Sequence, residues 1–87
     1  MNIKLEFIRR DIAGETFLVP IGEASKKYSG LIAVNELGAF IWDALPEAEN
    51  AASIVKKICE EYEVEEEEAA KDTEEFLGKL REMEIIE

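Results

Sequence analysis

The chain has 87 residues, 47% of them hydrophobic, which predicts a single folded domain over residues 1–87 with a modest core. Its 10 basic and 21 acidic side chains give a net charge of −11. This charge repels phosphate backbones and anionic lipids, so it argues against binding to nucleic acid or to a membrane. No apolar run approaches the roughly 20 residues of a membrane span, and no signal-peptide pattern is present, so we expect a soluble, cytoplasmic protein.

The side chains that most enzymes use are scarce. The chain has no histidine, which removes the commonest acid–base group and the commonest metal ligand. The single cysteine, Cys59, allows no internal disulfide, and its acidic neighbours disfavour a reactive thiolate, so we interpret it as a small core residue. The run Glu65–Glu68 lacks the alternation and the glycine of a calcium loop and is typical of a helix's first turn. The sequence therefore predicts no catalytic residues, no metal site and no cofactor.

The first third of the chain has the pattern of β-strands. Lys4–Arg9 roughly alternates polar and apolar residues, and Glu15–Val19 is rich in β-branched and aromatic residues. Gly14 between them can adopt a positive φ, which predicts a tight hairpin. The polar segment Gly22–Gly30 predicts a flexible loop, and Leu31–Val34 then predicts a short apolar third strand.

From Asn35 onward the hydrophobic period is that of helices. Asn35 is expected to cap a first helix that Pro46 ends, Asn50 to cap a second, and a third is expected to begin near Glu65. Trp42 lies off the main apolar stripe, which favours a helix packed on two sides over an exposed contact patch. The residues expected to face the core are Leu37, Phe40, Ile41, Ala44 and Leu45, then Ile54, Val55, Ile58, Cys59 and Tyr62, then Ala69, Thr73, Phe76, Leu77, Leu80 and Met83.

The order of the elements predicts an α+β fold in which a small three-stranded antiparallel sheet is followed by three helices. Ile85 and Ile86 form a short terminal extension that we expect to pack under the sheet. The charge is uneven along the chain: residues 1–45 carry 6 acidic and 5 basic side chains, and residues 46–87 carry 15 and 5. The excess of negative charge therefore lies in the second and third predicted helices.

Two segments, Gly14–Pro20 (GETFLVP) and Gly30–Trp42 (GLIAVNELGAFIW), resemble the PqqD family, named for pyrroloquinoline quinone biosynthesis protein D. The resemblance continues downstream through Ile54, Val55, Tyr62, Val64, Asp72, Phe76, Leu77, Leu80, Ile85 and Ile86 and so covers nearly the whole chain. The sequence departs from the family's pattern at Glu84, where a glycine usually precedes the closing aliphatic pair, so the exit of the third helix is expected to differ.

The resemblance implies a winged helix-turn-helix-like fold that serves as a recognition element for ribosomally synthesised, post-translationally modified peptides. Members of this family bind the leader segment of a precursor peptide and deliver it to a modifying enzyme, often a radical S-adenosylmethionine (SAM) protein, and are not catalysts themselves. The leader is expected to add as an antiparallel strand beside the third strand and to pack against the third helix. The implied peptide-binding residues are Leu31, Ile32, Ala33, Val34, Asp72, Glu75, Phe76, Lys79 and Met83.

Properties of the residues themselves agree with this mechanism. The third strand is short and apolar and follows a flexible loop, so its backbone can stay open for strand addition. If Ile32 and Val34 face the core, Leu31 and Ala33 point to the opposite face. The third helix has two shoulders beside its apolar stripe, one with Asp72, Glu75, Lys79 and Met83 and the other with Ala70, Glu74, Leu77 and Arg81. The sequence does not determine which shoulder meets the third strand; our hypothesis is the first.

Two alternatives remain open at this point. A winged-helix regulator would read DNA with its later helix, but residues 65–84 carry nine acidic side chains, counting Glu84 at the margin, against three basic ones. A structural docking subunit of a modifying enzyme would bind the enzyme and never touch the peptide. The same acidic surface predicts that a bound leader is apolar or basic where it meets the helices.

Overall fold

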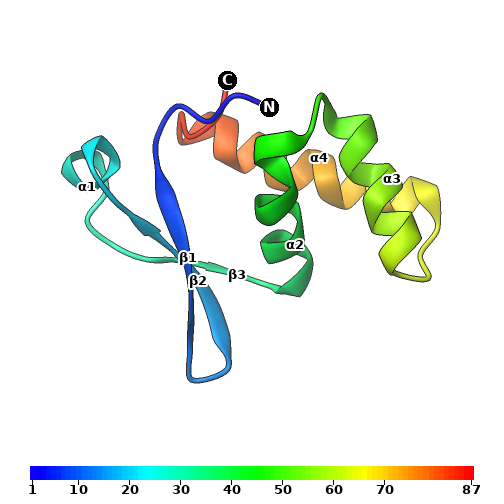
Figure 1. Ribbon diagram of the computed structural model, residues 1–87, viewed down its shortest axis with the longest axis horizontal. Helices are drawn as coiled ribbons and strands as arrows, with labels where there is room; N and C mark the ends of the chain where they lie inside the picture. The colour runs from blue at the N-terminus through cyan, green and yellow to red at the C-terminus, as the bar shows by residue number, and fades with distance from the viewer.

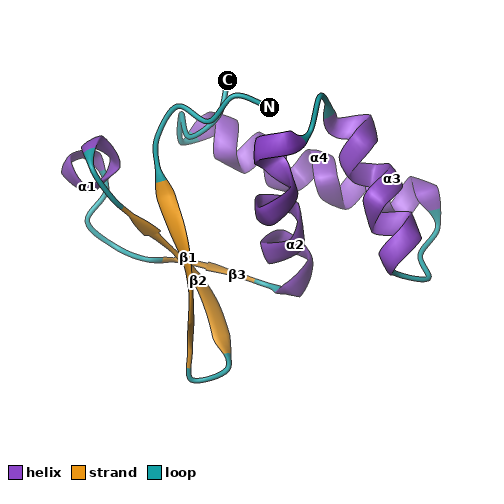
Figure 2. Ribbon diagram, in the orientation of Figure 1, coloured by secondary structure: helices purple, strands orange, loops and turns teal.

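A three-stranded sheet and four α-helices make up the computed structural model, which describes residues 1–87 (Figure 1). The elements follow in the order β1 (Phe7–Ile12), β2 (Glu15–Pro20), α1 (Glu23–Lys27), β3 (Ile32–Val34), α2 (Glu36–Ala44), the 3-10 turn η1 (Leu45–Glu47), α3 (Ala51–Glu61) and α4 (Glu66–Glu82). Figure 2 shows α2, α3 and α4 gathered on one side of the sheet and α1 apart from them. The predicted α+β fold, an antiparallel sheet followed by helices, is confirmed. No helix combines the length and the apolarity that crossing a membrane requires.

The hairpin between β1 and β2 has a two-residue turn. Ala13 and Gly14 both have positive φ, 51° and 83°, as the turn that matches the twist of a hairpin requires. The hairpin prediction is therefore confirmed, but the expected bounds of the first strand are wrong. The strand begins at Phe7 rather than Lys4 and continues to Ile12, because a two-residue turn pairs Ile12 directly with Glu15.

The strand order is β1-β2-β3, with both pairs antiparallel, so β3 lies at one edge of the sheet. Leu18 of β2 pairs with Ile32 and is fully buried, which identifies the face of the sheet that packs on the helices. Ile32 and Val34 are half-buried on this inner face, whereas Leu31 and Ala33 are exposed. The predicted alternation along the third strand is confirmed.

A short helix stands where the sequence predicts only a flexible loop. α1 occupies the middle of Gly22–Gly30, with Ala24 fully buried and the Ser25 hydroxyl donating to the Gly22 carbonyl oxygen at 2.6 Å. A helix of five residues with one buried side chain shows no 3.6-residue hydrophobic period, which explains why the pattern indicates a loop. Its burial depends on contacts with distant parts of the chain.

Both predicted asparagine caps are confirmed. The Asn35 side-chain oxygen accepts from the Gly38 N–H at 2.7 Å, and that of Asn50 accepts from the Ser53 N–H at 3.0 Å. Each satisfies one of the backbone donors left free at a helix start. α2 ends at Ala44, and Pro46 lies in the 3-10 turn that follows.

The core lies between the inner face of the sheet and the helices. Trp42 is 7% exposed and meets the ring of Phe7 edge-on, with ring centroids 6.3 Å apart, so its interpretation as a packed residue is correct. Ile85 and Ile86 are also buried, and Ile86 forms a bridge with Ile3. Leu77 is fully buried in the core stripe of α4, which confirms its prediction as a core-facing residue, whereas its placement on the second shoulder is wrong.

The exit of α4 keeps the backbone conformation that glycine favours. Glu84 has a φ of 60°, in the left-handed region. The Ile85 N–H donates to the Leu80 carbonyl at 2.9 Å and the Glu84 N–H to the Arg81 carbonyl at 2.9 Å, the bond pair of a Schellman motif. The glutamate therefore replaces the expected glycine without removing the left-handed turn.

Candidate functional site

The two edges of the sheet differ in their chemistry. The edge strand β1 carries the charged residues Arg9, Arg10 and Asp11, which hinder the pairing of another strand, whereas β3 carries no charged residue. The backbone of Gly30–Val34 forms no hydrogen bond outside the regular elements. The outer edge of β3 therefore has the backbone groups and the neutral side chains that an added strand needs.

The predicted helix residues come together beside the first turn of α2. A cavity of about 190 Å³ separates α2 from α4. Its lining consists of Asn35, Leu37, Gly38, Ile41, Asp72, Glu75, Phe76 and Lys79. Four of the five helix positions named from the sequence, Asp72, Glu75, Phe76 and Lys79, thus share one cavity. The other four lining residues are absent from the sequence-based set, because their proximity to α4 is a tertiary contact.

Gly38 connects β3 with α4. A Cβ atom at this position would lie 3.1 Å from Cε1 of Phe76 and 3.3 Å from Cβ of Val34. The last residue of β3 and the aromatic ring of α4 therefore contact the same point of α2, and a glycine allows this approach. The first shoulder of α4 thus lies next to the end of β3.

The second shoulder of α4 lies elsewhere. Ala70 lines a different cavity, of about 400 Å³, together with Val55 and Cys59 of α3. Cys59 is half-buried there, as a small packing residue, and remains a free thiol. No three His, Cys, Asp or Glu side chains are placed to hold a metal ion.

The segment before β3 is attached to the C-terminal end of α4. The Tyr28 hydroxyl donates to the carbonyl oxygen of Met83, and Lys27 forms an ion pair with Glu84. The hydrogen bond between Lys27 and Glu84 raises the pKa of the lysine and lowers that of the glutamate. Met83, the last of the predicted helix residues, is half-buried at this end.

We call the surface formed by these elements the β3–α4 face. Its residues are Leu31, Ile32, Ala33, Val34, Asp72, Glu75, Phe76, Lys79 and Met83. None of the three charged side chains on α4, Asp72, Glu75 and Lys79, takes part in an ion pair. The β3–α4 face therefore combines an open strand edge, a half-buried aromatic ring and unpaired charges of both signs, with one carboxylate in excess.

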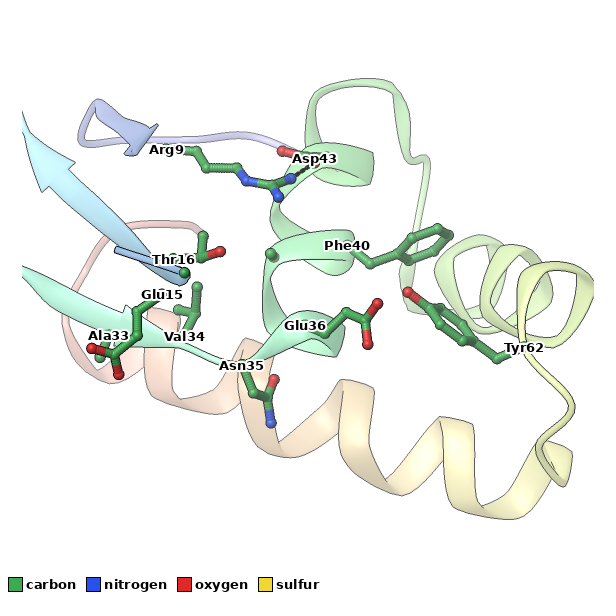
Figure 3. Close-up of a pocket in the computed structure, with 12 residues that line it drawn as sticks. Arg9, Glu15, Thr16, Ala33, Val34, Asn35, Glu36, Phe40, Asp43 and Tyr62 are labelled. Atoms are coloured by element: carbon green, nitrogen blue, oxygen red, sulfur yellow. Dashed lines mark hydrogen bonds and ion pairs between the residues drawn. The ribbon is translucent and has the colours of Figure 1, made fainter. Parts of the chain in front are cut away.

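A larger cavity, of about 600 Å³, lies between the hairpin and α2 (Figure 3). Arg9 of β1 forms an ion pair with Asp43 of α2 across it, and the charge of Asp43 is the main cause of the raised pKa of Arg9. Phe40 and Tyr62 meet edge-to-face on its wall, with centroids 5.5 Å apart. The sequence carries no local signal for the ion pair, because its partners lie 34 positions apart.

Comparison with known proteins gives two positive findings. The family model for coenzyme PQQ synthesis protein D (PqqD) matches residues 15–86. A solved structure, TbiB1 in complex with the TbiA(beta) leader peptide, is similar with a TM-score of 0.74 and 26% sequence identity, over 100% of this chain and 95% of that chain. No curated protein matches. Since the family model spans β2, α1, β3 and all the later helices, this chain belongs to the PqqD family.

Proposed function

We propose that this domain binds the leader segment of a ribosomally synthesised precursor peptide and presents it to a modifying enzyme. The observation that carries the proposal is the uncharged, open edge of β3 beside the first shoulder of α4, in a chain of the PqqD family. The similarity to TbiB1, which was solved with a leader peptide, supports a partner of the same class. The domain itself acts as an adaptor and performs no chemistry.

The leader binds as an antiparallel strand added to the outer edge of β3. Main-chain hydrogen bonds to β3 supply affinity that is independent of sequence, and side-chain contacts supply selectivity. Leu31, Ile32, Ala33 and Val34 provide the edge, and Asp72, Glu75, Phe76, Lys79 and Met83 provide the contacts on α4. Phe76 is half-buried, so part of its ring remains available to an apolar leader side chain.

The receiving enzyme is proposed to be a radical SAM protein, as the family resemblance implies. A leader held as a strand on a rigid sheet edge immobilises only one end of the precursor peptide. The following core segment of the precursor stays mobile and can enter the enzyme's active site. Tethering of this kind raises the effective concentration of the substrate segment at the enzyme.

Backbone methylation of the leader tests strand addition without touching the protein. A short peptide encoded near this chain's gene that binds the domain is synthesised with single N-methyl groups along its leader, and each peptide is titrated by calorimetry. In an antiparallel pair only every second residue donates to the neighbouring strand. We therefore expect binding to weaken about two- to tenfold at alternate positions, the effect of losing one net hydrogen bond of about 0.5–1.5 kcal/mol.

The positions between them act as internal controls and should bind like the unmodified leader. Weakening without a period of two would contradict strand addition while leaving leader binding intact. The absence of binding by the unmodified leader, with and without the neighbouring enzyme present, would contradict the proposed function as a whole.

A further inference from the structure

The face of the sheet that points away from the helices is unusually apolar. The strand register places Ile8 beside Val19, Arg10 beside Phe17 and Ile12 beside Glu15 on this face, with Ala33 next to Phe17 on the other side. Leu31, two residues before Ala33, points to the same face because side chains alternate along a strand. We call this surface the outer sheet face; its apolar members are Ile8, Ile12, Phe17, Val19, Leu31 and Ala33.

The three long helices leave the outer sheet face uncovered (Figure 1), and Ile8, Phe17 and Val19 on it are half-buried rather than exposed. α2, α3 and α4 lie on the opposite side of the sheet, and α1 follows β2 at the end away from the hairpin turn (Figure 1). Ile12 and Leu31, at opposite ends of the face, are 50% and 53% exposed, and only one other large hydrophobic side chain, Val64, is comparably exposed. The two six-residue strands are about 20 Å long, and the shorter β3 widens the sheet to about 10 Å between the outermost strand axes.

Arg10 lies within this apolar surface. Its cross-strand neighbour is Phe17, its side chain is exposed, and it forms no ion pair, although the chain carries 21 acidic residues. Arginine surrounded by apolar and aromatic residues is typical of the energetic centre of protein interfaces. The complementary surface is therefore apolar and carries a carboxylate opposite Arg10.

A second copy of the chain fits this surface poorly. Each copy carries a net charge of −11, so two copies repel one another at long range, although residues 1–45, which include the sheet, contribute only −1 of it. In a symmetric contact between two outer sheet faces, the one carboxylate on the face that Arg10 could meet is Glu15 of the second copy, which lies beside Ile12 at the hairpin end. A different protein can instead place a carboxylate directly opposite Arg10.

We propose that the modifying enzyme docks on the outer sheet face, with an apolar patch and a carboxylate that pairs with Arg10. This inference rests on the proposed function, because a leader strand added to β3 would continue the same face. Every second leader side chain would lie beside Leu31 and Ala33. An enzyme on this surface would contact the domain and the bound leader together.

Two substitutions on β1, outside the β3–α4 face, test the docking surface. Ile12→Thr removes an exposed apolar side chain and retains β-branching, and Arg10→Glu reverses the charge. We expect each to weaken binding of the leader-loaded domain to the enzyme encoded beside its gene by about tenfold, as measured by biolayer interferometry. Calorimetry should give the wild-type affinity for the leader, because neither residue lies on β3 or α4.

The matched controls are Val64→Thr and Lys57→Glu, which make the same chemical changes at exposed positions far from the sheet. Both should bind the enzyme like the wild type. Wild-type enzyme affinity of Ile12→Thr and Arg10→Glu would overturn the proposal. So would a self-association of the wild type, seen by sedimentation, that Ile12→Thr abolishes, because it would assign the face to a second copy.

The outcome is separable from that of the proposed function. If the wild type binds no leader, the leader hypothesis fails, and enzyme binding is then measured with the free domain. A tenfold loss in Ile12→Thr and Arg10→Glu would still support docking on the outer sheet face. Equal binding of the free variants and the free wild type would overturn it.

Discussion

Glu84 occupies a backbone conformation that is strained for any residue with a Cβ atom. Its φ of 60° is that of the residue after a helix C-cap, where glycine is usual. Glu84→Gly should therefore stabilise the protein, by up to about 1 kcal/mol in denaturant unfolding, because the lost ion pair with Lys27 is exposed and worth little. The same substitution at Glu74, an exposed position inside α4, should cost about 1 kcal/mol. Equal effects at the two positions would contradict this explanation.

Thr73 carries a polar atom in the core without a partner. The side chain is fully buried on α4, and its hydroxyl makes no hydrogen bond. Thr73→Val replaces this hydroxyl with a methyl group of similar size, so the free energy of unfolding should rise by about 1 kcal/mol. Thr16→Val is the matched control, since the Thr16 hydroxyl donates to Asp11 at 2.9 Å. A Thr73→Val variant that is no more stable than the wild type would show that the buried hydroxyl is satisfied in solution.

At the scale of elements, the junction of β3, α2 and α4 depends on Gly38. Gly38→Ala adds a methyl group 3.1 Å from Phe76 and 3.3 Å from Val34, so these side chains must move. We expect this shift to weaken leader binding several-fold in calorimetry, because both residues belong to the β3–α4 face. Gly78→Ala is the control: its Cβ would meet nothing within 4 Å, so it should only stabilise α4, by about 1 kcal/mol. Unchanged leader binding by Gly38→Ala would place the peptide away from this junction.

The elements also show which parts of the structure the sequence determines locally. Asn35 and Asn50 act on backbone groups three residues away, so their caps are visible in the sequence. The four cavity residues of α4 follow a helical period and could be grouped before the fold was known. By contrast, the α2 residues that complete the cavity face α4 only through tertiary packing. The sequence pattern likewise does not predict α1, because the burial of Ala24 comes from distant contacts.

The distribution of charge over the whole molecule separates its two halves. Residues 1–45, which include the sheet, α1 and all of α2, carry 6 acidic and 5 basic side chains, whereas residues 46–87 carry 15 and 5. A helix that reads DNA must approach phosphates, and the acidic α4 repels them. The same charge distribution leaves the sheet as the nearly neutral half, where a strand and a protein partner can approach without strong repulsion.

This distribution leads to a prediction about the leader itself. Asp72 and Glu75 line the cavity beside Phe76, so a leader side chain entering it should be apolar or basic. Substituting that leader residue with glutamate should weaken binding to the wild type at low salt by about 1 kcal/mol or more for each close carboxylate. The repulsion should shrink as salt screens it. Combining Asp72→Asn with Glu75→Gln in the protein should restore most of the lost affinity.

The control for this experiment removes the same charge from another part of α4. Glu66→Gln combined with Glu67→Gln neutralises two carboxylates in the first turn of the helix, outside the β3–α4 face. If local contact governs selectivity, this variant should still discriminate against the glutamate-bearing leader, whereas the Asp72 and Glu75 variant should not. Equal rescue by the two variants would mean that the net charge of the domain, acting at long range, selects the leader. A glutamate-bearing leader that binds the wild type undiminished would mean that the cavity is not part of the binding surface.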